Sequence, residues 1–184
     1  MATYIFNVLK DQLANGYLHL DDATRDGSTI TGDNTHTPVT GTFRACLIAP
    51  GSTLVSSSTT NGAISNAVDI VTCDQITTLN ELNISGYIGM AAGNEPDNDF
   101  PTAGLVKVAG SNGYTKWVPA NLTINSVASG STINGVLIVW DKNTGSNDLA
   151  TKVPLVWIGL GSDVDTNGGD ITINWATTGA IRLL

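Results

Sequence analysis

The sequence predicts a mainly β protein, an antiparallel β-sandwich or barrel-like domain with one short N-terminal helix. After Gly16, short runs rich in Val, Ile, Leu, Thr and Trp alternate with clusters of Gly, Asn, Asp and Ser. That alternation is typical of strands joined by turns. Five Asn-Gly pairs supply turn residues that tolerate positive φ. Helical spacing is convincing only at the start of the chain.

The helix is predicted over residues 4–14, because apolar residues recur every three to four positions from Ile5 to Leu13. Thr3 suits the N-cap position, since its hydroxyl can accept a hydrogen bond from the first turn. Gly16 suits the position just after the helix, where the backbone often turns left-handed. Every later segment has strand character instead.

Two predicted strands contain almost no polar residue: GVLIVW at 135–140 and LVWIGL at 155–160. Because neither alternates with polar side chains, both should be covered on both faces. We expect them to form a central hairpin joined by the polar turn KNTGSN. The full set of predicted strands is residues 17–20, 43–49, 67–71, 82–88, 104–108, 116–118, 122–125, 135–140, 154–160, 170–175 and 180–184.

The run DITINW at 170–175 alternates strictly. Ile171, Ile173 and Trp175 should point to one face, and the polar residues between them to the other. This pattern predicts a half-buried strand with one solvated face.

The chain is expected to form a single domain over residues 1–184, because 184 residues suit one domain and no internal repeat or interdomain linker is found. Three polar stretches are predicted as long loops, at 24–42, 52–65 and 93–104. The first has almost no apolar content and is predicted to be an exposed loop or an extended arm.

The composition excludes several function classes. Eight Lys and Arg against sixteen Asp and Glu give a net charge of −8, which disfavours nucleic-acid binding. No apolar run approaches the length of about 20 residues that spans a bilayer, and the start lacks the pattern of a secretory signal. We therefore expect no membrane partner and synthesis in the cytoplasm. Only 13% of the residues are charged, which fits a packed shell better than a free enzyme.

Cys46 and Cys73 each lie in an apolar stretch. Free cysteine behaves as a small hydrophobic residue, and the cytoplasm keeps thiols reduced, so buried free thiols are favoured over a disulfide. Neither thiol is expected to act as a nucleophile, because His19 and His36 lie in distant polar segments.

One motif resembles part of a calcium-binding loop. Asp163, Asp165, Asn167 and Asp170 follow the spacing of its first half. The twelfth position, however, is Asn174 rather than Glu, and the flanking segments are predicted strands rather than helices. A tight polar hairpin that uses the Asn-Gly-Gly sequence is therefore favoured, and we expect no metal and no cofactor.

Other candidate groups have simpler structural explanations. Scattered aspartates near the histidines or between prolines fit solvated loops, and only two glutamates occur as general-acid candidates. The tryptophans fall in predicted strands, where core packing is favoured over a platform for sugars. These residues are Asp21, Asp22, Asp26, Asp33, Glu81, Glu95, Asp97, Asp99, Trp117, Trp140, Trp157 and Trp175.

Three stretches resemble the small structural proteins of tailed-bacteriophage virions. The first is TYIFNVLKDQLANGYLHLDD with the later FRACLIAP, and the second, looser one is ELNISGYIGM. The third and most specific is the end, NGVLIVWDKNTGSNDLATKVPLVWIGLGSDVDTNGGDITINWATTGAIRLL. Together they cover about half of the chain. The polar stretch at 24–42 departs from the family pattern because it is longer.

The resemblance implies a non-enzymatic head decoration, or cement, protein. Such a protein binds the outer face of the major capsid protein lattice and stabilises the head, so its expected location is the outer surface of the virion, after synthesis in the bacterial host. The alternative is a tail, baseplate or host-binding virion protein. Many repeated contacts on a symmetric shell would turn modest affinity into high avidity without any active site.

Two kinds of interface are expected. The extended polar segments should contact the capsid protein, and the apolar hairpin should join copies of this chain into a dimer or trimer. Burial of the same hairpin inside one subunit would give the same sequence pattern. The candidate interface residues are Val136, Ile138, Trp140, Leu155 and Trp157.

Overall fold

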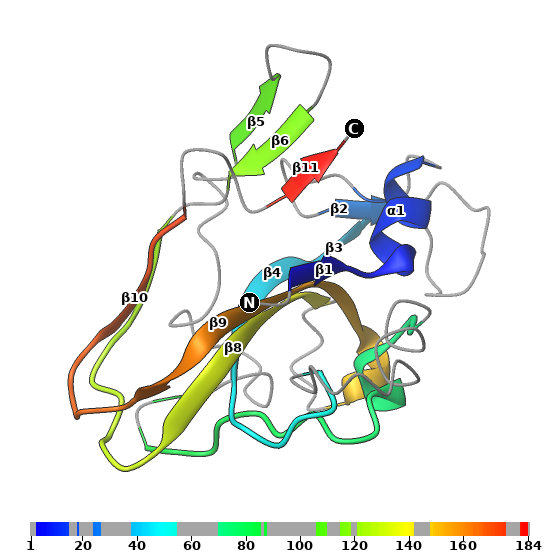
Figure 1. Cartoon of the computed structure of the whole chain (residues 1–184). Helices are drawn as coiled ribbons and strands as arrows, with labels where there is room; N and C mark the ends of the chain where they lie inside the picture. The colour runs from blue at the N-terminus through cyan, green and yellow to red at the C-terminus, as the bar shows by residue number, and fades with distance from the viewer. Residues whose placement is uncertain are drawn as a thin grey trace.

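The structure confirms a mainly β chain with antiparallel sheets and a short α-helix near the N-terminus (Figure 1). It is a computed structural model and describes residues 3–14, 18, 24–26, 38–54, 70–85, 87, 106–109, 115–118, 121–141, 148–175 and 181–183. Its strands are β1 (Thr3–Ile5), β2 (Thr24–Asp26), β3 (Pro38–Thr40), β4 (Thr42–Ile48), β5 (Val106–Ala109), β6 (Thr115–Val118), β7 (Leu122–Ile124), β8 (Thr132–Asp141), β9 (Lys152–Asp165), β10 (Ile171–Ile173) and β11 (Ile181–Leu183). Its helices are α1 (Asn7–Ala14) and the 3-10 helices η1 (Cys73–Gln75) and η5 (Leu149–Thr151).

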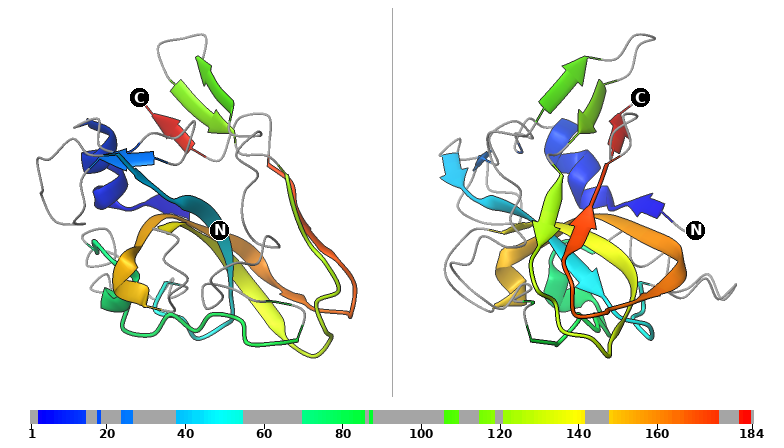
Figure 2. Two further views of the ribbon diagram at one scale, coloured as in Figure 1. Left: turned by 180° about the vertical axis from the view of Figure 1, so that it is seen from behind. Right: turned by 90° about the vertical axis from the view of Figure 1, so that its left-hand side faces the viewer.

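The centre of the fold is a four-stranded antiparallel sheet in the order β1-β9-β8-β4. β8 and β9 pair with each other in the two inner positions, which confirms the predicted central hairpin. Helix α1 lies on one side of this sheet and the two 3-10 helices on the other (Figure 2). Both faces of the inner strands are therefore covered, and residues 136–140 and 153–157 are buried.

A bulge explains how a proline sits in an inner strand. Ile138 pairs with Val156, but the next residue, Val139, pairs with Pro154, so Leu155 is extra in β9. Proline has no N–H to give to a ladder and is confined within sheets to edges and bulges. Pro154 lies at this bulge, one of the places in a sheet that tolerate proline.

A larger irregularity follows in β9. Between the pairs Ile133–Val164 and Gly135–Gly159, four residues of β9 face a single residue of β8. Gly161 has φ +82° there, a left-handed conformation that glycine adopts without steric cost. Beyond this point the two strands continue toward the corner at which the chain folds back.

The smaller sheets are also antiparallel: β10 with β7, β11-β6-β5, and β2 with β3. The described strands do not close into a barrel, so the barrel-like alternative is not formed. The prediction of a continuous loop over 24–42 is wrong at its two ends, where Thr24 pairs with Thr40. Residues 27–37, and most of the predicted loops 52–65 and 93–104, lie outside the described residues.

The N-terminal prediction needs one correction. Residues 3–5 form a strand that pairs with β9, from Thr3–Ile158 to Ile5–Val156, so the helix begins at Asn7 rather than residue 4 and Thr3 is not its N-cap. Phe6 continues this attachment through a hydrogen bond from its N–H to Leu155 O (3.0 Å). Pairing with a buried strand thus overrides the helical spacing at the first positions. The predicted end at Ala14 is confirmed.

The outer edge of β4 is covered by irregular chain around Leu82. Leu82 N donates to Leu47 O (2.9 Å), and an isolated bridge joins Ile48 to Glu81. The strand predicted over 82–88 is therefore wrong for the part that the structure describes. Covering the edge in this way prevents further strands from adding to it.

Two tryptophans pack over glycines in the core. A Cβ on Gly135 would meet the ring of Trp157, and a Cβ on Gly41 would meet the ring of Trp140. Both rings are almost fully buried. Each ring therefore occupies space that a side chain at the nearby glycine would otherwise fill.

Candidate functional site

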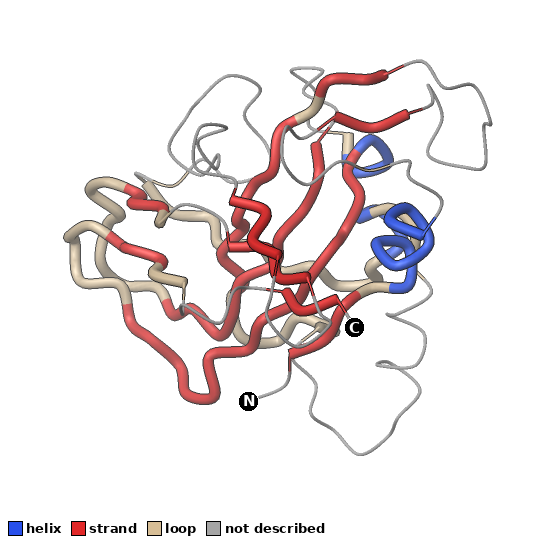
Figure 3. The backbone as a smooth tube through the Cα atoms, turned by 90° about the horizontal axis from the view of Figure 1, so that it is seen from above, coloured by secondary structure: helices blue, strands red, loops and turns tan. Residues whose placement is uncertain are grey.

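Residues 121–135 and 159–175 form a two-stranded arm that bends back toward the central sheet, here termed the bent arm. The ribbon of β7 and β10 leaves the end of β8 and β9 at a sharp angle, opposite the end where the helices gather (Figures 1 and 3). Its corner is held by Thr166 N, which donates to Ser131 O (2.8 Å). Gly168 takes φ +88° in the turn, a conformation that favours glycine.

The two faces of the ribbon differ in chemistry. Ile171 pairs with Ile124 on the face turned toward the sheet. On the other face, the hydroxyl oxygens of Thr123 and Thr172 lie 3.3 Å apart. The predicted alternation in DITINW is confirmed, with half-buried Ile171, Ile173 and Trp175 between exposed residues, although the strand itself ends at Ile173.

An apolar groove of about 390 Å³ lies along the inner side of the bent arm, here termed the arm groove. Its walls come from β4, from both central strands and from β10. The lining residues are Leu47, Ile133, Val136, Leu160, Val164, Ile171, Thr172, Ile173 and Asn174.

The lining of the arm groove favours binding over catalysis. Seven of its nine residues are aliphatic, and none is an acid, a base or a thiol. General acid–base and nucleophilic chemistry require such groups within hydrogen-bonding reach of a substrate. At the rim, the side chain of Val164 is 48% exposed, although large apolar side chains are usually buried.

The carboxylates of the motif that resembles part of a calcium loop have separate partners. Asp163 accepts a hydrogen bond from the Asn134 amide, Asp165 accepts from Thr132 Oγ1 (2.8 Å), and Asp170 accepts from Ser126 N (2.9 Å). Each of these contacts ties one strand of the bent arm to the other.

The fourth member of that motif, Asn167, also has a local partner. Its side-chain oxygen accepts from Gly169 N (3.0 Å), an arrangement found in tight polar turns. The prediction of a hairpin here is wrong, because the flanking strands do not pair with each other: β9 pairs with β8 and β10 with β7, so the Asn-Gly-Gly sequence lies at the corner of the bent arm. Among the residues that the structure describes, no three His, Cys, Asp or Glu side chains gather in a way that could hold a metal ion.

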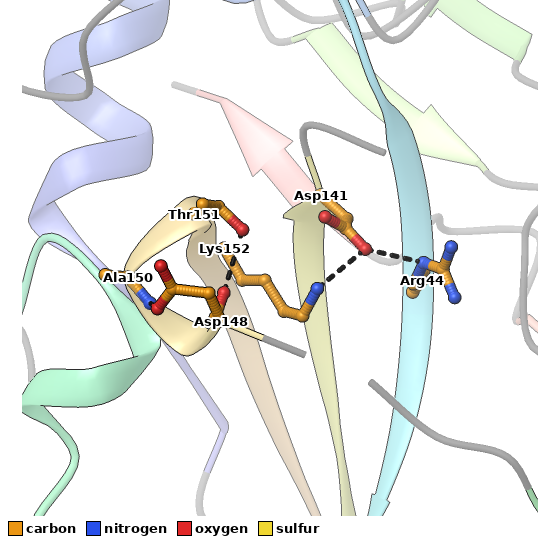
Figure 4. Close-up of polar contacts among 6 residues, drawn as sticks. All are labelled: Arg44, Asp141, Asp148, Ala150, Thr151 and Lys152. Atoms are coloured by element: carbon orange, nitrogen blue, oxygen red, sulfur yellow. Dashed lines mark hydrogen bonds and ion pairs between the residues drawn. The ribbon is translucent and has the colours of Figure 1, made fainter. Parts of the chain in front are cut away.

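A buried ion cluster lies at the other end of the central strands (Figure 4). Asp141 Oδ2 is 3.0 Å from Arg44 Nε and 2.9 Å from Lys152 Nζ. All three side chains are at least 96% buried. Charges that are buried so completely are paired, because an isolated ion in the protein interior is strongly destabilising.

Three strands bring this cluster together. Arg44 lies in β4, Asp141 ends β8 and Lys152 begins β9, where Asp141 and Lys152 are direct cross-strand partners. Just before Lys152, Asp148 accepts a hydrogen bond from Ala150 N (3.0 Å) and so caps η5. This cluster was not predicted from the sequence, although one signal of it is present: Asp141 and Lys152 border the two apolar runs.

Both cysteines are free and buried, as predicted. Burial raises the pKa of the Cys46 thiol well above its ordinary value, and the negative charge of Glu81 raises it further. Burial, and then Glu81, raise the pKa of Cys73 in the same way. The nucleophilic form of cysteine is the thiolate, so neither residue is suited to act as a nucleophile.

Tyr87 joins the chain around Leu82 to β4. Its hydroxyl accepts a hydrogen bond from Leu47 N (2.8 Å) and donates to Glu81 Oε1 (2.8 Å). Burial first, and then the negative charge of Glu81, raise the pKa of Tyr87 well above its ordinary value. The phenol therefore stays protonated and serves as a fixed link.

The predicted self-association residues are buried by the chain's own side chains. Val136, Ile138, Trp140, Leu155 and Trp157 are at most 5% exposed. The alternative explanation, burial on both faces inside one subunit, thus accounts for their apolar pattern. Of the five, only Val136 reaches the arm groove, and the other four are enclosed by the chain itself.

Several candidates lie outside the residues whose placement is described: His19, His36, Asp21, Asp22, Asp33, Glu95, Asp97 and Asp99. Asp26 lies in β2 and Trp117 in β6. Among the described residues, no helix is long and apolar enough to span a membrane.

No protein-family model, curated protein or solved structure matches this chain.

Proposed function

We propose that this protein is a non-enzymatic structural component of a tailed-phage virion that binds the outer face of the capsid and stabilises the head. The observation that carries a binding role is the arm groove, a hollow with aliphatic walls and no acid, base or thiol. The ionisable cluster around Asp141 supports the same role, because it is enclosed in the core and closed to a substrate.

The resemblance to virion proteins supports the capsid assignment. Its most specific stretch runs from residue 134 to residue 184. In this structure that stretch contains most of β8, all of β9 and β10, and one side of the arm groove. The elements that define the central sheet and its bent arm are thus the ones that carry the resemblance.

Copy number per virion tests the location. Quantitative peptide mass spectrometry against the major capsid protein should give hundreds of copies, because a decoration protein repeats with the lattice. A handful to a few dozen copies would contradict the capsid role and favour the alternative, a tail, baseplate or host-binding protein.

Head stability tests the role itself. A protein that binds only the assembled lattice stabilises it by mass action. Particles that lack this chain should release DNA at a lower temperature than complete particles, and adding back the purified chain should restore the higher temperature. Identical release curves would contradict a cementing role.

A further inference from the structure

We propose that the arm groove is a docking site for an extended segment of a partner protein in which Lys or Arg residues flank apolar side chains. The inference rests on the proposed function, because the capsid shell would supply that segment. The two features that carry it are the apolar walls of the groove and the unbalanced negative charge of the arm around it.

The first step concerns shape and polarity. The walls are formed by the inner faces of β8, β9 and β10, which diverge from the corner of the bent arm (Figure 1). Val164 is the one large apolar side chain that is exposed among the described residues, and it lies in this lining. An apolar segment laid along the groove would remove Val164, Ile171 and Ile173 from water, which is favourable.

The second step concerns charge. Asp163, Asp165 and Asp170 are exposed and accept hydrogen bonds from uncharged donors. Residues 121–140 and 153–175 contain no Lys or Arg. The arm thus carries three carboxylates that no cation of its own sequence balances.

The third step places these charges relative to the groove. Asp163 and Asp165 flank Val164 along β9, so by strand alternation they project to the face opposite Val164. Asp170 directly precedes Ile171 on the other wall. The three carboxylates lie outside the groove lining. They would therefore attract basic residues beside the bound segment by long-range electrostatics, which physiological salt screens over about 8–10 Å, rather than by direct ion pairs.

The same charges argue against other occupants. A second copy of this chain would bring an arm with the same three carboxylates, and like charges at an interface are repulsive. Nucleic acid and anionic lipid surfaces are repelled for the same reason. A basic, apolar protein segment is the occupant whose chemistry is complementary.

The main test uses capsid shells depleted of this chain and compares two variants. Val164→Glu places a charge in the groove, whereas Asn125→Glu places the same charge at an exposed position of the arm outside the lining. We expect Val164→Glu to weaken shell binding about tenfold or more, and Asn125→Glu to leave it unchanged. Melting temperatures identify any loss of folding, and Val164→Ser provides a second variant without added charge.

A second test does not depend on the shell. The probes are two short peptides, acetyl-Lys-Val-Leu-Val-Lys-amide and acetyl-Glu-Val-Leu-Val-Glu-amide. In NMR titrations the lysine peptide should shift the amide signals of Val164, Ile171 and Ile173, and the shifts should shrink as salt is raised. The glutamate peptide should leave these signals in place.

The outcomes separate the two proposals. If the wild-type chain binds shells and Val164→Glu binds equally well, the docking proposal is overturned while the proposed function stands. If the chain binds no shells but the lysine peptide shifts the groove signals, the proposed function fails and the docking chemistry stands. Equal shifts with both peptides, or a dimer of this chain that Val164→Glu dissociates, would overturn the basic partner.

Discussion

Replacing Asp141 should destabilise the fold more than any other conservative change of a single carboxylate among the described residues. Its Oδ2 atom contacts both Arg44 Nε and Lys152 Nζ, at 3.0 and 2.9 Å. Asp141→Asn therefore removes one negative charge from between two buried positive charges. Because the site is closed to water, solvent cannot screen the change.

The expected magnitude follows from these two contacts. The Lys152 contact is a hydrogen bond between charged groups, which contributes about 1.5–3 kcal/mol. The Arg44 contact is an ion pair, and removing one partner of a buried ion pair typically costs about 3–5 kcal/mol. We expect Asp141→Asn to lower the free energy of unfolding by about 3–5 kcal/mol. That is a large share of the roughly 5–15 kcal/mol by which a typical domain is stable.

Urea unfolding at pH 7, followed by circular dichroism, measures the change by linear extrapolation. The matched control is Asp148→Asn, which makes the same chemical change at an exposed helix cap, where Asn is also a good capping residue. The double variant with Lys152→Met should lose less than the sum of the two single variants, because it also removes one of the buried cations. A loss no larger than that of Asp148→Asn would refute the reasoning.

Three further predictions concern the core. Gly135→Ala should lower the free energy of unfolding by about 1–3 kcal/mol. The added Cβ would meet the Trp157 ring and lie 2.7 Å from Ile158 O. A free energy of unfolding equal to that of the wild type would contradict the packing of that ring. Tyr87→Phe should cost about 1–3 kcal/mol, since the Leu47 N–H loses its buried acceptor, and a neutral result in urea unfolding would argue against the link. Both thiols should react with a thiol reagent only after the protein unfolds. The free energy of unfolding should also fall as the pH rises above about 8.5. In the folded protein the raised pKa of each buried thiol keeps it protonated, whereas the same thiol ionises in the unfolded chain. The slope should approach 1.4 kcal/mol per pH unit for each thiol; Cys46→Ala should halve it, and a flat profile from pH 8.5 to 10 would count against the buried thiols.

The strands of the centre could be predicted because their sequence pattern matches their environment. Residues 136–140 lack alternation, and the structure covers both of their faces. Ile171 and Ile173 alternate with polar residues, and their strand has one exposed face. In both cases the residues that the local pattern assigns to the interior are the residues that the rest of the fold covers.

The errors arise where distant residues decide the structure. The helical spacing includes Ile5, yet residues 3–5 pair with β9, whose position no local pattern reveals. The strand-like run at 82–88 covers the edge of β4 instead, held by a bridge to Glu81 and by the Tyr87 hydroxyl. These outcomes depend on partners more than 30 residues away.

The candidate site was only partly predictable for the same reason. The polar turn around Asn167 follows from its own sequence, since Gly168 takes the positive φ expected of the Asn-Gly-Gly run. The turn joins two strands that pair with other strands rather than with each other, so the predicted hairpin is not formed. The arm groove instead needs β4, β9 and β10 to meet, and Val164 gains its significance only when the arm bends back. The one local sequence signal of the arm groove was Val164, a single apolar residue between Asp163 and Asp165.

The pairing of β1 with β9 has a consequence for synthesis. Thr3 pairs with Ile158, so β1 cannot join the sheet until Ile158 has been synthesised. At about 5–20 residues per second this delay is roughly 8–30 s. The apolar strand β4 emerges early and likewise waits for β8, which follows some 90 residues later. The nascent chain therefore presents β4 as an unpaired, aggregation-prone strand for about half of translation, and slowing elongation before β8 should lower the soluble yield.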